Sequence, residues 1–594
     1  MSDDDPPDLV ARAHALGVAT SYLDWAGRRI EVDEDVVADV VARLGEPIPP
    51  GTDTLERPTP PPLPLPPRCW GWTIQLYALY SESSWGIGDF ADLRDFAVWS
   101  AQALGADLVL VNPLHAVVPE HPVVASPYSP TSRRFTNPLY LRIEDVPEYA
   151  KAPAEVRRRV ENLRIGPPDP SRLVDRDAVW DAKHAALQEL WPGAREIEVS
   201  GDLRDFATFC ALAEEFGVPW QRWPEDLRDP RSAAVSAAHL RLADRVAFHA
   251  WLQVLCDEQL EAAQRAARQA GMRIGIVHDL AVGVDPGGAD AWALQDVLAQ
   301  DVSVGAPPDS YNQLGQNWAL PPWRPEALAR QGYRPYRAML AAILRHGGGV
   351  RVDHVMGLSR LWWVPAGNTA DRGTYVSYDA DELLDVLVAE AEARAAVVVG
   401  EDLGTVEPVM REALDKRGVL GSAVLWFERE GDAADGPLKP PAAWRERAMA
   451  SISTHDLPTA HGFLAGEHVR IRHELGQLGR PVEDEQAQAD ADRQALLDGL
   501  VVEGTLDPEH VDDRDEVTLA MHRYLARTPS AILLASPYDV LGEVRQPNLP
   551  GTVDQYPNWR IPLPVSLEVL RFDTRVTATA DALRRADEDG SGGC

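Results

Sequence analysis

The sequence predicts an α/β protein built on a closed (β/α)8 TIM barrel, with large helical insertions and a short N-terminal helical domain. Eight short runs rich in apolar and β-branched residues alternate with longer helix-like stretches, a pattern typical of parallel strands joined by helices. Four of these runs end in a carboxylate residue, and the carboxyl ends of barrel strands meet at one rim. An open doubly wound sheet also fits this number of strands.

The predicted strands are spread over most of the chain, and two long helical stretches interrupt their alternation. We expect helical insertions at about 114–270 and at about 457–528, the second of which contains the charged stretch 483–493. The eight strands are predicted at Thr73–Leu79, Asp107–Pro113, Met272–Asp279, Gly349–Asp353, Ala396–Glu401, Ala423–Phe427, Ala450–Ser453 and Ser530–Ala535.

The regions flanking the barrel differ from it in composition. Residues 1–56 are predicted to form a small helical region, with amphipathic stretches on either side of a polar turn at Trp25. Residues 57–67 include PTPPPLPLPP and should be an extended linker, because proline lacks the amide proton that helices and strand ladders need. The catalytic domain is expected at 68–584. Residues 585–594 are predicted to be a disordered tail.

Net charge and cysteine spacing limit which functions and which cellular location fit the sequence. The formal net charge of -35 over 594 residues repels phosphate backbones and anionic lipids, so we expect no nucleic-acid or membrane partner and favour a neutral substrate. The four cysteines have no CxxC spacing, which argues against a zinc site and a disulfide framework. An acidic N-terminus and the lack of a long apolar run predict a cytoplasmic protein.

The carboxylates that end four of the runs are the candidate chemistry: Asp279, Asp353, Glu401 and Asp456. Each alone fits a helix N-cap equally well, but four in one register favour a site. Arg351 and Asp353 are two residues apart, so their side chains leave the same face of a strand. The guanidinium should hold Asp353 ionised as a nucleophile, although a structural ion pair has the same pattern. Glu401 would then be the proton donor.

Other patterns allow weaker alternatives. Asp456, with His455 before it, could hold sugar hydroxyls, although a lone histidine is more often a core residue. Three His-Asp neighbours suggest a metal-dependent hydrolase, but adjacent strand residues point to opposite faces and no HExxH occurs. Gly86-Ile-Gly88 lacks the third glycine of a dinucleotide motif and indicates a tight turn. The 18 tryptophans include rings that could stack on sugars, although most, such as Trp362, Trp363 and Trp559, are expected in the core.

Several longer strings resemble one family, the amylomaltases, which are 4-α-glucanotransferases of glycoside hydrolase family 77 in the α-amylase clan. The resemblance covers nearly the whole chain. The strings are ATSYLDWAGR, SSWGIGDFADL, SPYSPTSRRFTNPLYL, GAPPDSYNQLGQNWALPPW, VRVDHVMGL, VGEDLG, STHD and QPNLPGTVDQYPNW.

The resemblance implies a role for each matched residue. Asp353 is similar to the family's nucleophile, Glu401 to its general acid/base and Asp456 to its transition-state stabiliser. The segment 305–318 resembles a flexible cover over the acceptor side. The N-terminal segment is similar to that of the bacterial form with an extra N-terminal region, but shorter. The implied substrate-binding residues are Arg351, Asp279, His455, Ser126, Tyr128, Gln316, Trp318 and Asn548.

The expected activity is therefore transfer of α-1,4-glucan segments from a maltooligosaccharide donor to an acceptor glucan, with retention and without a metal or organic cofactor. The alternatives are an α-amylase-like hydrolase that uses the same carboxylates, a non-catalytic glucan-binding protein and the metal-dependent hydrolase. The sequence does not predict the oligomeric state or the donor length.

Overall fold

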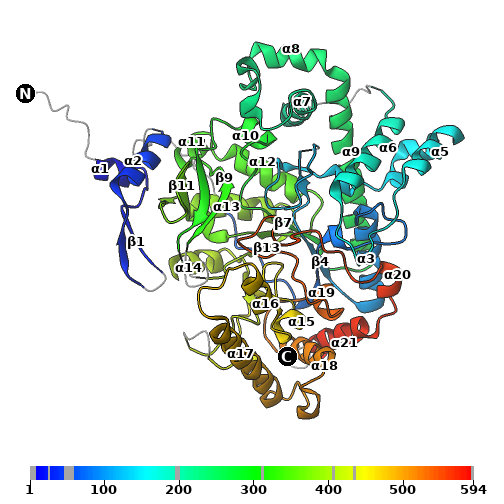
Figure 1. The fold of residues 1–594 in the computed structure, drawn as a ribbon, viewed down its shortest axis with the longest axis vertical. Coiled ribbons are helices and arrows are strands. Elements are labelled where there is room, and N and C mark those ends of the chain that lie inside the picture. Colours follow the sequence, from blue (N-terminus) through cyan, green and yellow to red (C-terminus); the bar gives the residue numbers. More distant parts are fainter. Residues whose placement is uncertain are drawn as a thin grey trace, which may run out of the picture.

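The computed structural model describes residues 9–24, 27–45, 59–118, 120–193, 201–308, 314–404, 408–431 and 436–589, with backbone alone for 585–589. Helices surround a central sheet, and the N-terminal elements lie at one side of the molecule (Figure 1).

Eight strands form one parallel sheet with the spatial order β13, β10, β7, β4, β3, β16, β15, β14. The two end strands meet where the Gly400 N–H donates to the Leu420 carbonyl at 2.7 Å and Val399 bridges Leu420 in parallel. The sheet is thus a closed barrel, which confirms the predicted fold class. Its strands are β3 (Cys69–Ile74), β4 (Leu108–Val111), β7 (Gly275–Leu280), β10 (Gly349–Val352), β13 (Val397–Gly400), β14 (Gly421–Val424), β15 (Ala448–Ser451) and β16 (Ile532–Ala535).

Each predicted strand overlaps one of these eight, but the first is displaced. Thr73–Leu79 was the expected range, whereas β3 ends at Ile74 and Leu76–Ala78 form a 3-10 helix. The Leu76 N–H donates to the side-chain oxygen of Asn112 at 2.7 Å. This side-chain contact takes the chain off the backbone ladder at the barrel rim, so the apolar run continues after the strand has ended.

Helices pack outside the barrel, and local capping sets where they begin and end. α3 (Phe90–Leu104) follows Asp89, which forms a capping box with Asp92, and stops at Gly105 in the left-handed conformation. It packs against α9 (Ala243–Gln269). The other outer helices include α12 (Arg334–Ile343), α13 (Ala380–Glu392), α14 (Pro408–Lys416), α18 (Arg514–Ala526) and α21 (Thr574–Asp589).

Two insertions project from the barrel at opposite ends of the view in Figure 1. The first, between β4 and β7, contains β5 (His115–Ala116), β6 (Ser132–Thr136), α4 (Pro147–Lys151), α5 (Ala154–Leu163), α6 (Arg176–Leu190), α7 (Gly201–Phe216) and α8 (Ala233–Arg241) before α9. The second, between β15 and β16, contains α15 (Ala460–Leu464), α16 (Glu467–Glu474) and α17 (Val482–Val502), followed by α18.

A four-stranded antiparallel sheet, which the sequence did not predict, has the order β12, β11, β8, β9. Its strands come from the connections after β7 and after β10. The segment 305–318, expected to be a loop, therefore belongs largely to the β8–β9 hairpin, and 309–313 lie outside the described residues. The strands are β8 (Val302–Ala306), β9 (Gln316–Leu320), β11 (Arg360–Pro365) and β12 (Thr374–Ser377).

The N-terminal region is not purely helical, so that prediction is wrong in part. A two-stranded hairpin of β1 (Ser21–Leu23) and β2 (Arg29–Glu31) separates α1 (Leu9–Ala15) from α2 (Glu34–Arg43). Each strand has only three residues, too few for alternation to stand out from a helical pattern. The described part of the linker has no regular structure, and its Leu63 N–H donates to the Arg417 carbonyl at 2.9 Å.

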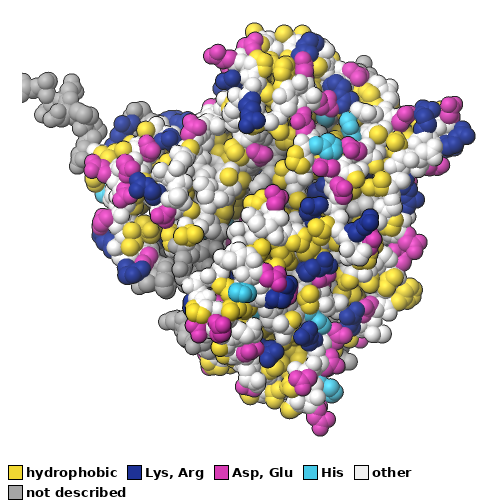
Figure 2. Space-filling model, in the orientation of Figure 1, with side chains coloured by type: hydrophobic (Ala, Val, Ile, Leu, Met, Phe, Trp, Pro, Cys, Tyr) yellow, Lys and Arg dark blue, Asp and Glu magenta, His cyan; other side chains and the backbone are white. Residues whose placement is uncertain are grey.

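The C-terminal helix is longer than expected. α21 continues to Asp589, so it covers the first five residues of the predicted disordered tail, and residues 590–594 lie outside the described part. Among the described residues, no helix has the length and apolarity that a membrane crossing requires. On the face in Figure 2, acidic and basic side chains are interspersed rather than gathered by sign.

Candidate active site

Strand register brings the predicted carboxylates together at the C-terminal rim of the barrel. In the β7–β10 ladder, Arg351 lies directly opposite Asp279. On its other side β10 pairs with β13, so Asp353 and Glu401 both follow a paired position, Val352 opposite Gly400. Because parallel strands keep one register, these side chains are neighbours although they are far apart in sequence.

Arg351 joins two of the carboxylates. Its Nη1 donates to both oxygens of Asp279 at 2.8 and 2.9 Å and to Oδ1 of Asp353 at 2.9 Å. The guanidinium is buried, which disfavours its charge, but the two aspartates outweigh this and the pKa of Arg351 lies well above its usual value. The arginine therefore carries a fixed positive charge between them.

Asp353 has one oxygen engaged and one open. Among the described residues, no donor reaches its Oδ2, and its side chain is 20% exposed. Burial raises the pKa of Asp353 to about 6, although Arg351 opposes that shift. Arg351, which also binds Asp279, offsets this rise only in part. Asp353 is still mainly ionised at pH 7 and presents a free oxygen.

Glu401 is held by backbone donors. Its Oε1 accepts from the Leu403 N–H at 2.7 Å and its Oε2 from the His354 N–H at 3.1 Å. Burial raises the pKa of Glu401, while Arg351 and these two N–H groups oppose the rise. A raised pKa is what a carboxylic acid needs in order to donate a proton near neutrality.

Asp456 lies in the loop after β15 and has the opposite electrostatic setting. Its Oδ1 accepts from Asn548 Nδ2 at 2.6 Å, and its Oδ2 lies 3.2 Å from Nε2 of His455. Burial favours the neutral acid, but His455 and Asn548 outweigh it and lower the pKa of Asp456. Burial similarly disfavours the His455 cation, yet Asp456 raises the pKa of that imidazole. The two residues form an ion pair.

An aromatic wall stands beside the carboxylates. Tyr128 donates its hydroxyl to Oδ2 of Asp279 at 2.7 Å and stacks on His455 with ring centroids 5.0 Å apart. Trp559 lies 5.3 Å from Tyr128 and 5.2 Å from His455. These three rings come from distant loops and together with the carboxylates make a site shaped for a polar molecule with an apolar face, such as a sugar.

The comparisons with known proteins agree with this geometry. The model of the 4-alpha-glucanotransferase family (Glyco_hydro_77) matches residues 74–567. The chain belongs to this family. A 4-alpha-glucanotransferase of Mycobacterium tuberculosis (strain ATCC 25618 / H37Rv) is 50% identical over 547 residues, covering 87% of this chain and 75% of that protein. One of Haemophilus influenzae is 35% identical and covers 83% of this chain and 75% of that protein.

Solved structures give the same result. The amylomaltase from Corynebacterium glutamicum has a TM-score of 0.84 and 33% identity, and the match covers 97% of this chain and 99% of that one. The amylomaltase from Streptococcus agalactiae in complex with acarbose has a TM-score of 0.68 at 17% identity, covering 88% and 99% of the two chains, which supports the fold. The resemblance of the sequence to the 4-α-glucanotransferase family is therefore confirmed.

In this member of the glucanotransferase family, the remaining predicted residues lie farther from the carboxylates. Ser126 accepts from the Tyr128 N–H at 3.3 Å, so it shapes the turn that presents Tyr128. Trp318, whose Nε1 donates to Gln316 at 3.2 Å, lies edge-on to His354 with centroids 5.3 Å apart. His354 follows Asp353 in the chain and donates its N–H to Glu401, so Trp318 lies on the Glu401 side of the candidate site.

Residues that the sequence did not single out also belong to the site. Trp559 was expected in the core, and it is 4% exposed, yet it packs on the two aromatic site residues. Gln546 fixes the loop that carries Asn548, because its Nε2 donates to the carbonyls of Asp456 and Asn548. Both lie in the string QPNLPGTVDQYPNW, which could have indicated them. A cavity of about 40 Å³ inside the barrel is lined by Gln75 and Asn112 together with four of the site residues, Asp279, Arg351, Glu401 and His455.

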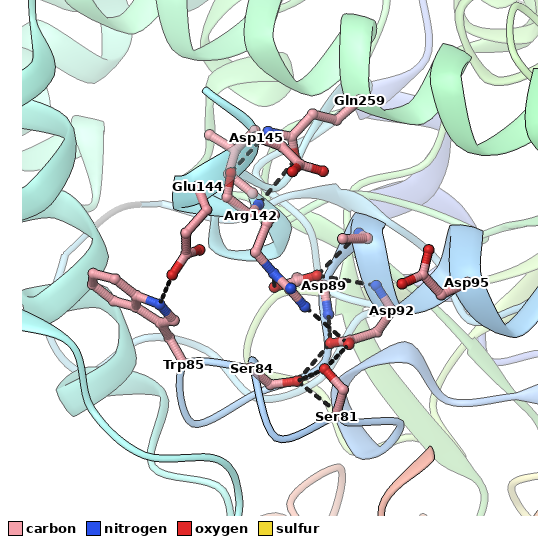
Figure 3. Close-up of polar contacts among 12 residues, drawn as sticks. Ser81, Ser84, Trp85, Asp89, Asp92, Asp95, Arg142, Glu144, Asp145 and Gln259 are labelled. Atoms are coloured by element: carbon pink, nitrogen blue, oxygen red, sulfur yellow. Dashed lines mark hydrogen bonds and ion pairs between the residues drawn. The ribbon is translucent and has the colours of Figure 1, made fainter. Parts of the chain in front are cut away.

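The string SSWGIGDFADL lies outside the site. Figure 3 shows its Asp89 and Asp92 gathered around Arg142, with Ser81 and Ser84 beside them. Arg142 reaches Asp89 at 2.5 Å and Asp92 at 2.9 Å. Gly86 and Gly88 fall in the turn before α3, as the tight-turn interpretation requires. The string therefore serves a buried ion cluster and a helix start.

The histidines next to aspartates do not converge. His278 lies beside Asp279 on β7 but is directed to the His346 carbonyl at 3.3 Å, whereas Asp279 contacts Arg351. Within the described ranges, no group of three or more histidine, cysteine, aspartate or glutamate side chains is arranged to hold a metal ion.

Proposed function

We propose that this protein is a 4-α-glucanotransferase that moves α-1,4-glucan segments from a maltooligosaccharide donor to the 4-hydroxyl of an acceptor glucan or glucose. The observation that carries the proposal is the open Oδ2 of Asp353 beside Glu401, in a chain that belongs to the 4-alpha-glucanotransferase family. Acarbose is bound in a related amylomaltase, which supports a glucan-like substrate here.

In the first step, Asp353 Oδ2 attacks the anomeric carbon of the donor. The bond from that carbon to the glycosidic oxygen breaks, and Glu401 gives its proton to the departing oxygen. A β-linked glucosyl ester on Asp353 results. Arg351 keeps Oδ1 engaged, so the attacking oxygen is defined by the hydrogen bonds around it.

In the second step, the 4-hydroxyl of the acceptor gives its proton to Glu401 and attacks the same carbon. The ester bond breaks, Asp353 is released as a carboxylate, and the new α-1,4 bond has the original configuration. Asp456, fixed by Asn548 and His455, is proposed to hold sugar hydroxyls while the ring flattens. Tyr128 and Trp559 would pack on the apolar sugar face.

Transfer requires that an acceptor sugar outcompete water, which is present at about 55 M. A well-oriented hydroxyl can have an effective molarity of about 10⁵ M or more, provided that a surface holds the acceptor. Gln316 and Trp318 on the hairpin beside His354 are proposed to supply that surface. The α-amylase-like hydrolase uses the same carboxylates but needs no such surface.

Maltotriose alone tests the proposal. Transfer should release glucose together with longer maltooligosaccharides and add few new reducing ends. Reducing ends that rise in step with glucose, without longer chains, would establish the hydrolase instead. The proposed steps use carboxylates and a guanidinium only, so activity should survive prolonged EDTA treatment, and restoration by a divalent ion would contradict this.

We also propose a cytoplasmic location. Cys210 and Cys256 are buried free thiols in the described structure, as expected for a protein kept in a reducing compartment. Fractionation of cells that make the full-length protein would test this assignment.

A further inference from the structure

The N-terminal region, residues 9–45, is built into the antiparallel sheet that carries Trp318. Val18 bridges Val376 of β12 in antiparallel fashion. The Ala19 N–H donates to the Tyr375 carbonyl and the Ser377 N–H to the Gly17 carbonyl, both at 2.9 Å. The region thus adds a further row of backbone hydrogen bonds along the edge of β12.

The same region contacts both faces of that sheet. On one face, the α2 residues Val37 and Val40 are buried in a hydrophobic cluster with Val304 and Trp363. On the other face, Tyr22 lies edge-on to Trp362 with ring centroids 5.0 Å apart. The N-terminal region thus packs on both faces of the sheet, and we expect it to fix the position of the sheet.

Trp318 lies on the α2 face of the sheet. Side chains alternate along β9, with Asn317 and Ala319 exposed and Trp318 half-buried, and Trp318 packs against the cluster formed by Val40 and its neighbours. Its ring then meets His354, whose N–H donates to Glu401. A continuous line of contacts therefore runs from α2 through the sheet to the proposed acid/base.

We propose that the N-terminal region is a positioning element for the acceptor: through the packing of α2 on the antiparallel sheet, it holds Trp318 where an acceptor sugar binds. The proposal rests on the proposed transferase function. Cores are close-packed, so removing volume from the cluster under α2 shifts the side chains that pack on it, Trp318 among them. Loosened packing at α2 should therefore weaken acceptor capture without altering the carboxylates.

The experiment uses the full-length chain with Val40→Ala, and Val37→Ala as a second variant in case the first does not fold. Isotope-labelled glucose serves as acceptor and maltotriose as donor. We expect the ratio of label transferred to bonds hydrolysed to fall by about 3- to 30-fold, because small misplacement of a reactant is costly. The KM for glucose should rise, while the donor kcat/KM measured at saturating glucose stays unchanged.

The matched control is Val246→Ala, which removes the same atoms from a buried site, 2% exposed, between α7 and α9. It should lower thermal stability without changing the transfer ratio. In a Trp318→Ala background, Val40→Ala should have no additional effect on the ratio, because the two changes interrupt one line of contacts.

An unchanged ratio in Val40→Ala, an equal fall in Val246→Ala, or an additive effect on top of Trp318→Ala would each overturn the inference. A wild-type protein that makes no longer chains from maltotriose would instead refute the proposed function, so the two failures are distinguishable.

Discussion

Two clusters in this molecule have the same composition, one arginine between two aspartates, and differ in what their oxygen atoms meet. Around Arg142, Ser81 and Ser84 donate to Asp92 at 2.6 and 2.7 Å. Backbone N–H groups also donate to the carboxylates of both aspartates. The two aspartate side chains are 0% and 2% exposed. Around Arg351, Asp353 keeps an open oxygen and is 20% exposed.

The electrostatic constraint is the same in both clusters. One guanidinium supplies one positive charge against two carboxylates, so burial leaves one carboxyl group with a high proton affinity. Burial and its neighbour Asp89 raise the pKa of Asp92 to about 7, and burial raises that of Asp353 to about 6. The difference teaches that an arginine with two aspartates does not define a catalytic site. What distinguishes the candidate site is the accessible Oδ2 of Asp353, which no donor reaches among the described residues.

The largest expected effect is on activity. Asp353→Ala should lower kcat by about 10⁴-fold or more, because loss of a covalent nucleophile removes the intermediate itself. Thermal stability should change little, since Asp279 retains Arg351 as its partner. Assays with maltotriose and thermal unfolding test both parts. Near-normal turnover by this variant would remove Asp353 from the proposed role.

Loss of Arg142 should affect stability rather than activity. Arg142→Met leaves two buried carboxyl groups without the guanidinium that pairs with them, which costs about 3–5 kcal/mol. With an unfolding entropy of about 2.1 cal/mol/K per residue, this lowers the Tm of the 594-residue chain by about 2–4 °C. The kcat of the folded enzyme should not change.

Arg94→Met is the matched control for that variant. Arg94 pairs at the surface with Asp95 and Asp145, two residues that Figure 3 shows near the same cluster, and exposed ion pairs contribute little. Equal Tm losses for the two substitutions would show that the cluster around Arg142 has no special importance.

The third expected difference between the two clusters is in the pH dependence of kcat/KM, which should depend on Asp353 and not on Asp92. Asp353 must be ionised to attack, and its pKa is about 6, so kcat/KM should fall by up to about tenfold per pH unit below that value. Glu401 must be protonated, so the alkaline limb follows its raised pKa. Asp92→Asn should leave this profile unchanged. A profile flat between pH 4 and 7 would contradict the assignment of Asp353.

The barrel was predictable because each of its strands is a short buried run with a recognisable composition. β10 and β13 end within one residue of the predicted limits. The antiparallel sheet was missed because β8 and β9 are separated by a glycine- and proline-rich segment and pair with strands from a later connection. Pairing across such a distance leaves no local pattern in the sequence.

The candidate site was predictable in its main residues but not in its electrostatics or in the packing between loops. Strand ends indicated Asp279, Asp353 and Glu401, and the resemblance added Tyr128 and Asn548. The pKa of Asp353 was not predictable, because it depends first on burial and then on Arg351 also binding Asp279 across the ladder. The role of Trp559 depends on packing between three loops, and such contacts cannot be seen in a linear pattern.

The smallest expected effect is the pH dependence of stability in the Arg142 cluster. Asp92 loses its proton near its ordinary pKa of 3.8 when unfolded and near about 7 when folded. Between these values the folded state binds the additional proton, so its stabilising contribution is fully present below about pH 3.8 and is lost as the pH rises through about 7. Asp92→Asn removes this titration. The Tm of the wild type minus the Tm of this variant should therefore fall by about 1–3 °C from pH 4 to pH 7.5, whichever of the two proteins is the more stable. A difference that stayed constant or grew with pH would show that Asp92 is ionised in the folded protein, and the electrostatic parallel between the two clusters would then fail.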